Sequence, residues 1–426
     1  MTEAFLHYVW QHQMFDSGLA TTDGQPVVVL KAGTLNHDSG PDFFNARIRI
    51  GDVEWAGNVE VHIHSSDWRA HRHEHDPAYN NVVLHVVFEN DSDVYMENGK
   101  IPPTVELKSH LHPSLLKNYE ALVAPEADNG IPCSGRVGGI PEFILHSFLD
   151  RLSVERIESK SKTVRRLLEE SKGNWTQTCY WLLARYFGGK VNALAFELLA
   201  KATDLNILSR WSDDPVRVES ILMGQAGFLD DYFEEAYPRR LQADYQSLRA
   251  ALGMEPIGDS LWKFHRMRPS GFPTIRISQF AQFLTKTPRL FSRLLAVDDA
   301  KEMERMFDCT AASYWDNHYR FDQPAGSSLS KRLGRMQADI IIINAWVPLL
   351  FVYGAEHNQQ HYKDQAVSLL SQLPAENNVV VRRWRQCGVV PRNAAESQAL
   401  LQLQGGYCSA RQCLQCPIGF HLLNRK

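Results

Sequence analysis

The chain has 426 residues, and its hydrophobic fraction of 44% and charged fraction of 22% are ordinary for a folded globular protein. This length exceeds what one hydrophobic core usually fills, so two or three domains are expected. The most apolar stretch, 340–353, is interrupted by Asn344 and Pro348, and the N-terminus lacks the basic start and cleavage site of a secretory signal. We therefore expect a cytoplasmic protein with no membrane partner.

The net charge of −4 is distributed unevenly along the chain. Residues 1–135 contain 8 Lys and Arg against 19 Asp and Glu, and they also hold 11 of the 17 His. The first third therefore carries a net charge of −11 and the remainder +7. This division places oxygen and imidazole ligands at one end of the chain and a basic surface at the other.

The first third reads as a short amphipathic helix followed by β-strands. The helix is expected near 3–15, and runs of β-branched residues predict the strands. These strands are expected at 27–31, 46–50, 58–64, 80–88 and 104–108. Turn dipeptides at 51–52 and 98–99 separate some of them, which indicates a mixed or antiparallel sheet over residues 1–135.

A Gly- and Pro-rich stretch at 128–141 indicates a domain boundary, after which apolar residues recur at helical spacing. Helices are expected at 143–152, 179–187, 193–202, 280–296 and 366–373. We therefore predict an α+β protein with a β/α domain at 1–135, a helical region at 136–375 and a C-terminal segment at 376–426.

Acidic and imidazole side chains follow the strands of the first domain. Asp42 stands just before one strand, and Glu60 and His62 are two residues apart on another, so the latter two share one face of the sheet. Two carboxylates with a third polar group suit Mg²⁺ or Mn²⁺ and a metal-activated water. A solvated polar surface is the alternative interpretation.

This arrangement resembles the PD-(D/E)XK nuclease superfamily, which has an Asp at one strand and Glu-x-Lys on the next. The resemblance implies a restriction-endonuclease-like sheet in which Asp42 and Glu60 bind the metal. His62 takes the place of the lysine that positions the nucleophile, and this is a departure because imidazole is shorter and often neutral at pH 7.

The histidines of this region suggest a second kind of metal site. His62 and His64 share a face with Glu60, and His71, His73 and His75 follow after a loop. Imidazole is a common ligand of Zn²⁺ and Fe²⁺, so these four additional histidines are candidate ligands beside His62. His85, within an apolar strand, is interpreted as a core histidine bonded to the backbone.

Four cysteines near the C-terminus form a second candidate metal site. Cys408, Cys413 and Cys416 have the spacing C-x4-C-x2-C-P, and Cys387 precedes them by 21 positions. Four thiolates close a tetrahedral Zn²⁺ site or hold an iron–sulfur cluster. Buried thiols are the alternative, and Cys133, Cys179 and Cys309 are interpreted as core residues.

One segment of the helical region carries candidate phosphate ligands. Arg266, Arg268 and Arg276 surround the loop fixed by Pro269 and Pro273 at a predicted helix start. Arginine at such a corner suits bidentate pairing with phosphate or carboxylate, and a structural role at helix ends is the alternative.

Several motifs together resemble a family of uncharacterised bacterial proteins. They are GPDFFNARI, VEVHIHSSDW, HEHDPAYNNVVLHVVF, RPSGFPTIRISQFA and YCSARQCLQCPIG. The chain is similar along essentially its whole length to domain of unknown function 2851. This resemblance implies a bacterial, largely Bacteroidetes, cytoplasmic protein and brings no activity with it.

Three functions follow from these observations. The leading hypothesis is a metal-dependent nuclease-like protein acting on DNA or RNA, with Asp42 and Glu60 holding Mg²⁺ or Mn²⁺, His62 positioning water and the basic helices holding the phosphate backbone. The second is a histidine-ligated Zn²⁺ or Fe²⁺ hydrolase or oxygenase. The third is a non-catalytic module that binds protein or RNA.

Overall fold

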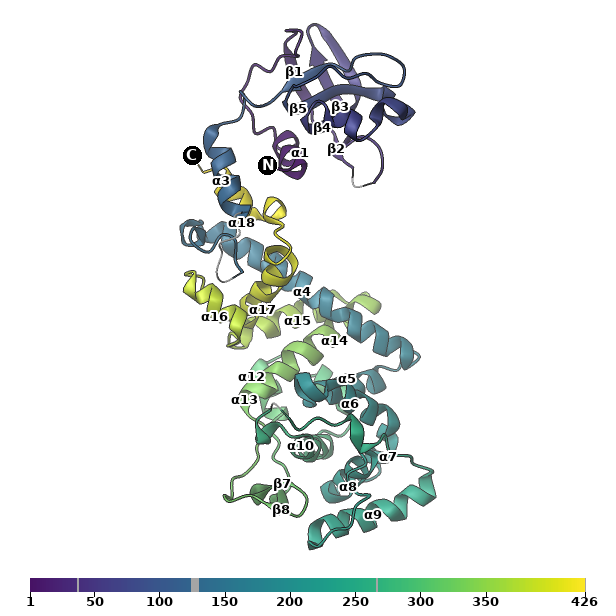
Figure 1. Ribbon diagram of the computed structural model, residues 1–426. Helices are drawn as coiled ribbons and strands as arrows, with labels where there is room; N and C mark the ends of the chain where they lie inside the picture. The colour runs from purple at the N-terminus through teal and green to yellow at the C-terminus, as the bar shows by residue number, and fades with distance from the viewer. Residues whose placement is uncertain (37, 124–129, 266, 426) are drawn as a thin grey trace. The chain divides into compact units, whose positions relative to one another are not determined.

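The computed structural model describes residues 1–36, 38–123, 130–265 and 267–425 (Figure 1). Internal contacts divide the chain into two compact units. The N-terminal unit comprises residues 1–145 and 404–426, and the helical unit comprises residues 146–403. The predicted boundaries after residues 135 and 375 differ from this division, because the end of the chain packs with its beginning. The predicted α+β fold class is confirmed.

A six-stranded mixed sheet forms the centre of the N-terminal unit, in the order β1-β3-β4-β5-β6, with the short β2 paired to β3. The strands are β1 (Val27–Lys31), β2 (Thr34–Leu35), β3 (Phe43–Ile50), β4 (Val53–His64), β5 (Val82–Glu89) and β6 (Thr104–Glu106). β1, β3 and β4 are antiparallel neighbours, whereas β5 runs parallel to both β4 and β6. The predicted mixed sheet is therefore present.

Helix α1 (Glu3–Gln11) packs against this sheet. It begins at Thr2, whose side chain accepts a bond from the Phe5 amide, and its apolar face buries Phe5 and Trp10. The Trp10 indole donates to the Ala32 carbonyl at 3.0 Å. Between β4 and β5 the chain forms three short helical segments, α2 (Asp67–Ala70), η1 (His73–His75) and η2 (Pro77–Asn81).

Of the predicted C-terminal segment 376–426, residues 376–403 belong to the helical unit and residues 404–426 to the N-terminal unit, where α3 (Pro113–Val123) packs with α18 (Pro417–Leu423). The Asn118 amide donates to the Leu423 and Arg425 carbonyls, at 3.2 and 2.9 Å. The Arg411 guanidinium donates to the Val123 carbonyl at 2.6 Å. These bonds explain why no separate C-terminal domain forms.

The helical unit is built mainly from α-helices around one large apolar core. The helices are α4 (Glu142–Glu170, of which the first turn precedes the unit boundary), α5 (Trp175–Phe187), α6 (Gly189–Ala202), α7 (Leu205–Ser209), α8 (Pro215–Gln225), α9 (Ala236–Leu252), α10 (Pro273–Lys286), α11 (Leu290–Leu295), α12 (Ala300–Met306), α13 (Arg335–Ile341), α14 (Val347–Glu356), α15 (Gln360–Gln372), α16 (Val379–Gln386) and α17 (Ala394–Gln402). The strands β7 (His318–Arg320) and β8 (Gln323–Pro324) form a small hairpin.

The most apolar stretch, in which Asn344 and Pro348 interrupt the run of apolar residues, is helical throughout. α13 and α14 join through a π-helical turn at Ile342–Trp346, in which the Asn344 amide donates to the Ile340 carbonyl at 2.7 Å. Pro348 directly follows the π-helical turn, at the second residue of α14. Arg335–Glu356 is long and apolar enough to cross a membrane, but 78% of its most apolar window is buried in the protein.

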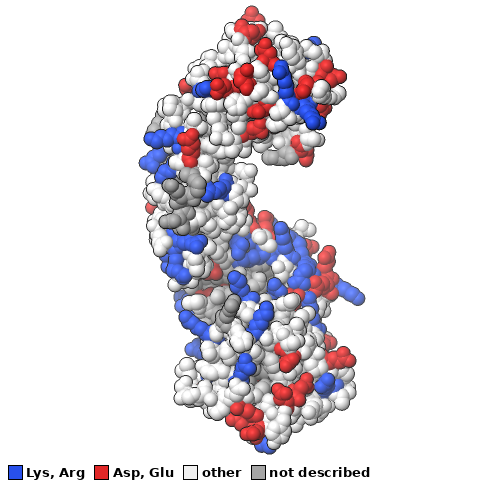
Figure 2. All heavy atoms as spheres, viewed as in Figure 1, with Lys and Arg blue, Asp and Glu red and all other residues white. Residues whose placement is uncertain are grey.

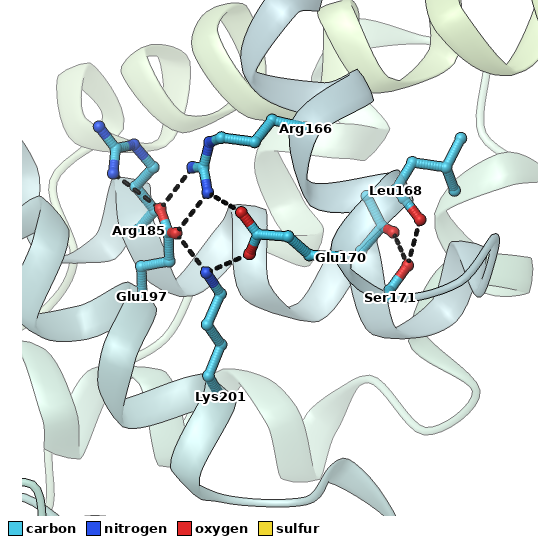
Figure 3. A network of polar contacts seen from close by, with 8 residues as sticks. Arg166, Leu168, Glu170, Ser171, Arg185, Glu197 and Lys201 are labelled. Carbon is cyan, nitrogen blue, oxygen red and sulfur yellow. Dashed lines mark hydrogen bonds and ion pairs between the residues drawn. The ribbon is translucent and has the colours of Figure 1, made fainter.

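A network of ion pairs ties α4, α5 and α6 together (Figure 3). The buried Glu197 carboxylate accepts bonds from Arg166, Arg185 and Lys201 at 2.7 to 3.1 Å. Burial opposes ionisation, but these cations outweigh it and lower the pKa of Glu197 to about 2. The network therefore stabilises the charged carboxylate inside the helical unit.

Candidate functional site

The β3–β4 hairpin brings Asp42 and Glu60 together. Asp42 immediately precedes β3, and the pairing of Phe43 with Val59 sets the position of residue 60 beside it. The Asp42 amide donates to Glu60 Oε2 at 3.1 Å, and the Val61 amide donates to Asp42 Oδ2 at 2.9 Å. Each carboxylate is thus bonded to the backbone of the opposite strand, and the two predicted acidic residues share one site.

His62 joins this site from β4, as the spacing predicts. Its Nε2 lies 3.5 Å from Glu60 Oε1, and both side chains are nearly inaccessible, with 1% and 4% of their residue surfaces exposed. Its Nδ1 lies 2.9 Å from Nε2 of His85 on β5. In the tautomer with the proton on Nδ1, His62 donates to His85 and directs its Nε2 lone pair toward Glu60.

Two further imidazoles reach the same point from the segment after β4. Arg72 adopts a left-handed conformation with φ 63°, which turns the chain between His71 and His73. His71 Nδ1 lies 3.1 Å from His62 Nε2, and His73 Nε2 lies 3.1 Å from Glu60 Oε1. Ligand atoms of the three histidines all lie within 4.8 Å of one another.

These distances suit a single metal ion. In a tetrahedral zinc site with metal–nitrogen distances of about 2.0–2.1 Å, neighbouring ligand atoms lie about 3.3 Å apart. Three contacts among Glu60, His62, His71 and His73 lie at 3.1 to 3.5 Å, and the residues whose ligand atoms all lie within 4.8 Å of one another are His62, His71 and His73. Three imidazole nitrogens favour Zn²⁺, Mn²⁺ or Fe²⁺ over Mg²⁺, which prefers oxygen ligands.

The other two candidate histidines are exposed. His64 ends β4, where its backbone amide donates to Asp67 Oδ2, and His75 lies 3.6 Å from Glu74. Neither contributes to the group formed by His62, His71 and His73 among the described residues. His64 is therefore two residues from His62 on the strand, as expected, but it is not part of the histidine group.

Two residues of this site were not anticipated from the sequence. His7, on α1, lies 3.1 Å from Asp42 Oδ2, and its side chain is 22% exposed. His85 bonds to His62 rather than to the backbone. A single histidine on an amphipathic helix carries no signal of this contact, because the packing of α1 on the sheet creates it.

Burial and neighbouring charges shift the pKa values of these groups in different directions. Burial and the neighbouring Asp42 charge raise the pKa of Glu60, whereas burial and the surrounding imidazoles lower the pKa of His62 to about 2. Burial likewise lowers the pKa of His85 to about 3. Burial opposes protonation of His7, but its hydrogen bond to Asp42 and the nearby carboxylates raise its pKa. His62 and His85 are therefore neutral at pH 7, and His7 is the imidazole best able to carry a proton.

A pocket of about 960 Å³ reaches the site through His7. It lies between α1 and α18, where Tyr8, His12 and Phe420 form an aromatic group with ring centroids 4.6 to 6.1 Å apart. His7 is thus the side chain that connects this pocket with Asp42. A substrate in the pocket would approach the carboxylates from the side of α1.

The cysteines of the C-terminal motif fall in both units. Cys408, Cys413 and Cys416 belong to the N-terminal unit, whereas Cys387 ends α16 in the helical unit. Cys179 and Cys309 are buried in the core of the helical unit. Metal binding by the predicted cysteine set stays a prediction.

The candidate phosphate ligands lie in the helical unit. Arg276 is on α10 and donates to Gln279 at 3.1 Å and to Gln337 at 3.5 Å; burial lowers its pKa to about 10. Arg268 is exposed before η5 (Pro269–Gly271), and Arg266 lies outside the described residues. Phosphate binding by these arginines stays a prediction.

The fold and site together define an α+β protein with a histidine- and carboxylate-lined metal-competent site on its mixed sheet. Residues 3–379 match the family described as protein of unknown function (DUF2851), and the chain belongs to this family. No curated protein and no solved structure matches the chain.

Proposed function

We propose that the N-terminal unit is a metal-dependent phosphodiester hydrolase of the nuclease type. The observation that carries the proposal is the reciprocal bonding of Asp42 and Glu60 across β3 and β4, with His62 on the same strand as Glu60. An Asp at one strand and Glu-x-His on its neighbour correspond to the positions that the PD-(D/E)XK resemblance implies. We also propose that this protein is bacterial and cytoplasmic.

The metal would be held by His62, His71 and His73, with Glu60 beside them and a position left open for water. We favour Zn²⁺ or Mn²⁺ because all three ligands are imidazoles. A bound ion of this kind polarises a phosphoryl oxygen and lowers the pKa of a coordinated water. His85 fixes the orientation of His62 through the 2.9 Å contact between their rings.

The resemblance implies Asp42 as a metal ligand and His62 as the residue that positions water, but Asp42 pairs with His7 and His62 lies in the histidine group. In this proposal Asp42 and His7 would instead transfer the proton. Asp42 holds the His7 ring at 3.1 Å, and both side chains are partly exposed, at 23% and 22%, in contrast to the buried Glu60, His62 and His73. A protonated His7 can donate to the departing oxygen of a phosphodiester, and its carboxylate partner orients it for that transfer. His7 also lines the pocket, so it faces the space that a substrate would fill.

Nucleic acid is the proposed substrate because of the charge distribution. Residues 146–403, which form the helical unit, hold 33 Lys and Arg against 29 Asp and Glu, a net charge of +4, and Figure 2 shows Lys and Arg side chains on this unit. Such a surface supplies sequence-independent attraction to phosphates. The aromatic group of Tyr8, His12 and Phe420 in the pocket offers rings on which a base can stack.

The test is hydrolysis of single- and double-stranded DNA and RNA, and of a chromogenic phosphodiester, by the full chain with Zn²⁺ or Mn²⁺. We expect a chelator to abolish cleavage. Asp42→Asn and Glu60→Gln should each reduce the cleavage rate at least 100-fold. His7→Gln should reduce the rate on a substrate with a poor leaving group. The exposed His75→Asn is the matched control and should retain full activity. Cleavage that survives Asp42→Asn in pure protein would contradict the proposal.

The three converging imidazoles favour a second candidate, a Zn²⁺ or Fe²⁺ enzyme of a different reaction class. It predicts metal that remains bound after dialysis together with an absence of phosphodiester hydrolysis. Loss of that metal in His71→Ala combined with His73→Ala supports this candidate. Unchanged metal content in the double variant rejects both catalytic functions and leaves a binding or assembly role.

A further inference from the structure

One side of α1 lines the pocket that reaches His7. His7, Tyr8 and Gln11 on α1 and His12 directly after it recur at helical spacing, so these side chains lie on the same side of the helix. Another wall comes from the last part of the chain, where α18 contributes Phe420. The volume of about 960 Å³ is within the range of small-molecule sites in proteins. The pocket is therefore large enough for a ligand of that size.

The walls of this pocket carry little charge. The described residues that line it include no Lys, Arg, Asp or Glu. They combine apolar side chains with Gln11 and Gln415, whose amides offer both donors and acceptors. Partial burial lowers the pKa of His12, which favours its neutral ring at pH 7. The pocket therefore suits an uncharged group with polar edges better than it suits a phosphate.

Three rings in the pocket offer surfaces for a planar ligand. The planes of Tyr8, His12 and Phe420 are inclined to one another by 56 to 71°, so none of these pairs is stacked face to face. A planar group can therefore stack on one of the rings without separating a stacked pair. Phe420 is 42% exposed and Tyr8 is 5% exposed, which makes Phe420 the more accessible of the two. We expect a planar ligand to stack on Phe420.

The pocket borders the groups proposed to act on the phosphodiester. His7 lines it and lies 3.1 Å from Asp42 Oδ2. A base and its phosphate are joined through one sugar, so a base held in the pocket brings a phosphate toward His7. Bases of a duplex are paired and stacked, and such a base enters a pocket only after it leaves the double helix at a cost in free energy. A base of a single strand enters without the cost of unpairing.

We propose that this pocket binds one unpaired nucleobase stacked on Phe420, and that the substrate is therefore a single strand of nucleic acid rather than a duplex. The identity of the ligand as nucleic acid rests on the proposed function. Phe420 acts here in substrate selection and takes no part in the chemical step. Stacking on an aromatic side chain tolerates every base, because each base has a π-face. The selection is thus between unpaired and paired bases, with little preference for sequence.

The experiment measures binding by the full chain in the presence of a chelator, so that no strand is cleaved. Fluorescence anisotropy compares a short labelled single strand, the same strand in a duplex, and a strand of equal length without bases. The single strand should bind most tightly. Phe420→Ala should weaken its binding roughly 5- to 100-fold, the effect of one lost stacked base, and leave the other two affinities unchanged. Tyr232→Ala, which removes an 86% exposed ring from the helical unit, is the matched control and should change none of them.

Phe420→Tyr keeps an aromatic ring and should bind the single strand as the wild type does, which separates loss of stacking from misfolding. Unchanged single-strand affinity in Phe420→Ala would overturn the assignment. Wild-type protein that binds the single strand no more tightly than the duplex or the base-free strand would also overturn it. The two proposals fail separately: this binding pattern without hydrolysis of any phosphodiester contradicts the proposed function alone, whereas metal-dependent hydrolysis without the pattern contradicts only the pocket assignment.

Discussion

Replacing Glu219 with Gln should stabilise the helical unit at alkaline pH and have little effect in acid. Glu219 lies on α8 with no exposed surface, and its carboxylate accepts bonds from the Ser278 hydroxyl at 2.6 Å and the Trp315 indole at 2.7 Å. Both donors are neutral. Burial therefore outweighs these hydrogen bonds and raises the pKa of Glu219 from 4.5 to about 7.

The sign of the pH dependence follows from that increase. Below about pH 4.5 the carboxyl group is protonated in both the folded and unfolded chains, and it carries no ionisation penalty. As the pH rises from about 4.5 to about 7, the carboxyl group ionises in the unfolded chain but stays protonated in the folded one, so the folded state loses stability, and the loss is complete above about pH 7. The difference between 4.5 and about 7 corresponds to a loss of about 3 kcal/mol.

Glu219→Gln keeps the size of the side chain and removes this penalty. We expect its melting temperature relative to the wild type to rise by roughly 6 to 12 °C between pH 5 and pH 8, for about 3 kcal/mol in a unit of this size. Calorimetry of the full chain at several pH values measures it, with the exposed Glu356→Gln as the control for lost charge. A difference from wild type that stays the same at pH 5 and pH 8 would refute the reasoning.

Three further predictions concern packing, charge and the site. Glu197→Gln should destabilise the helical unit by about 1 to 3 kcal/mol at pH 7, because Arg185 loses its carboxylate whereas Arg166 and Lys201 keep Glu170, and urea unfolding measures this loss. Gly224→Ala should cost about 1 to 3 kcal/mol by the same assay, since its Cβ would lie 2.2 Å from the Tyr245 ring, whereas Gly334→Ala meets nothing and should be neutral. His85→Leu should weaken metal binding about 10- to 100-fold in a metal titration with an otherwise intact fold, because His62 loses its orienting partner; unchanged affinity would exclude that role.

The local sequence pattern was sufficient to predict the strands and the proximity of Asp42, Glu60 and His62. β-branched runs marked β1, β4 and β5, and the two-residue period of a strand put Glu60 and His62 together. The same pattern could not identify which other histidines would join them. That choice depends on the left-handed conformation of Arg72 and on the helical turns around it, which local composition does not determine.

Long-range packing accounts for what the sequence did not reveal. His7 meets Asp42 only because α1 lies against the sheet, and Asn118 meets Leu423 only because residues 404–426 belong to the N-terminal unit. Neither His7 nor Asn118 has a neighbour in sequence that signals its partner. The cysteine spacing grouped Cys387 with Cys408, Cys413 and Cys416, although Cys387 belongs to the helical unit.

The most direct test of the proposed site is to locate the metal in crystals of the full chain grown with Mn²⁺ or Zn²⁺. Anomalous difference density collected at the absorption edge of the metal should show a peak between Glu60, His62, His71 and His73. A peak at that point supports the account of a metal-dependent hydrolase. Crystals saturated with the metal that show no anomalous peak among these four side chains would contradict it.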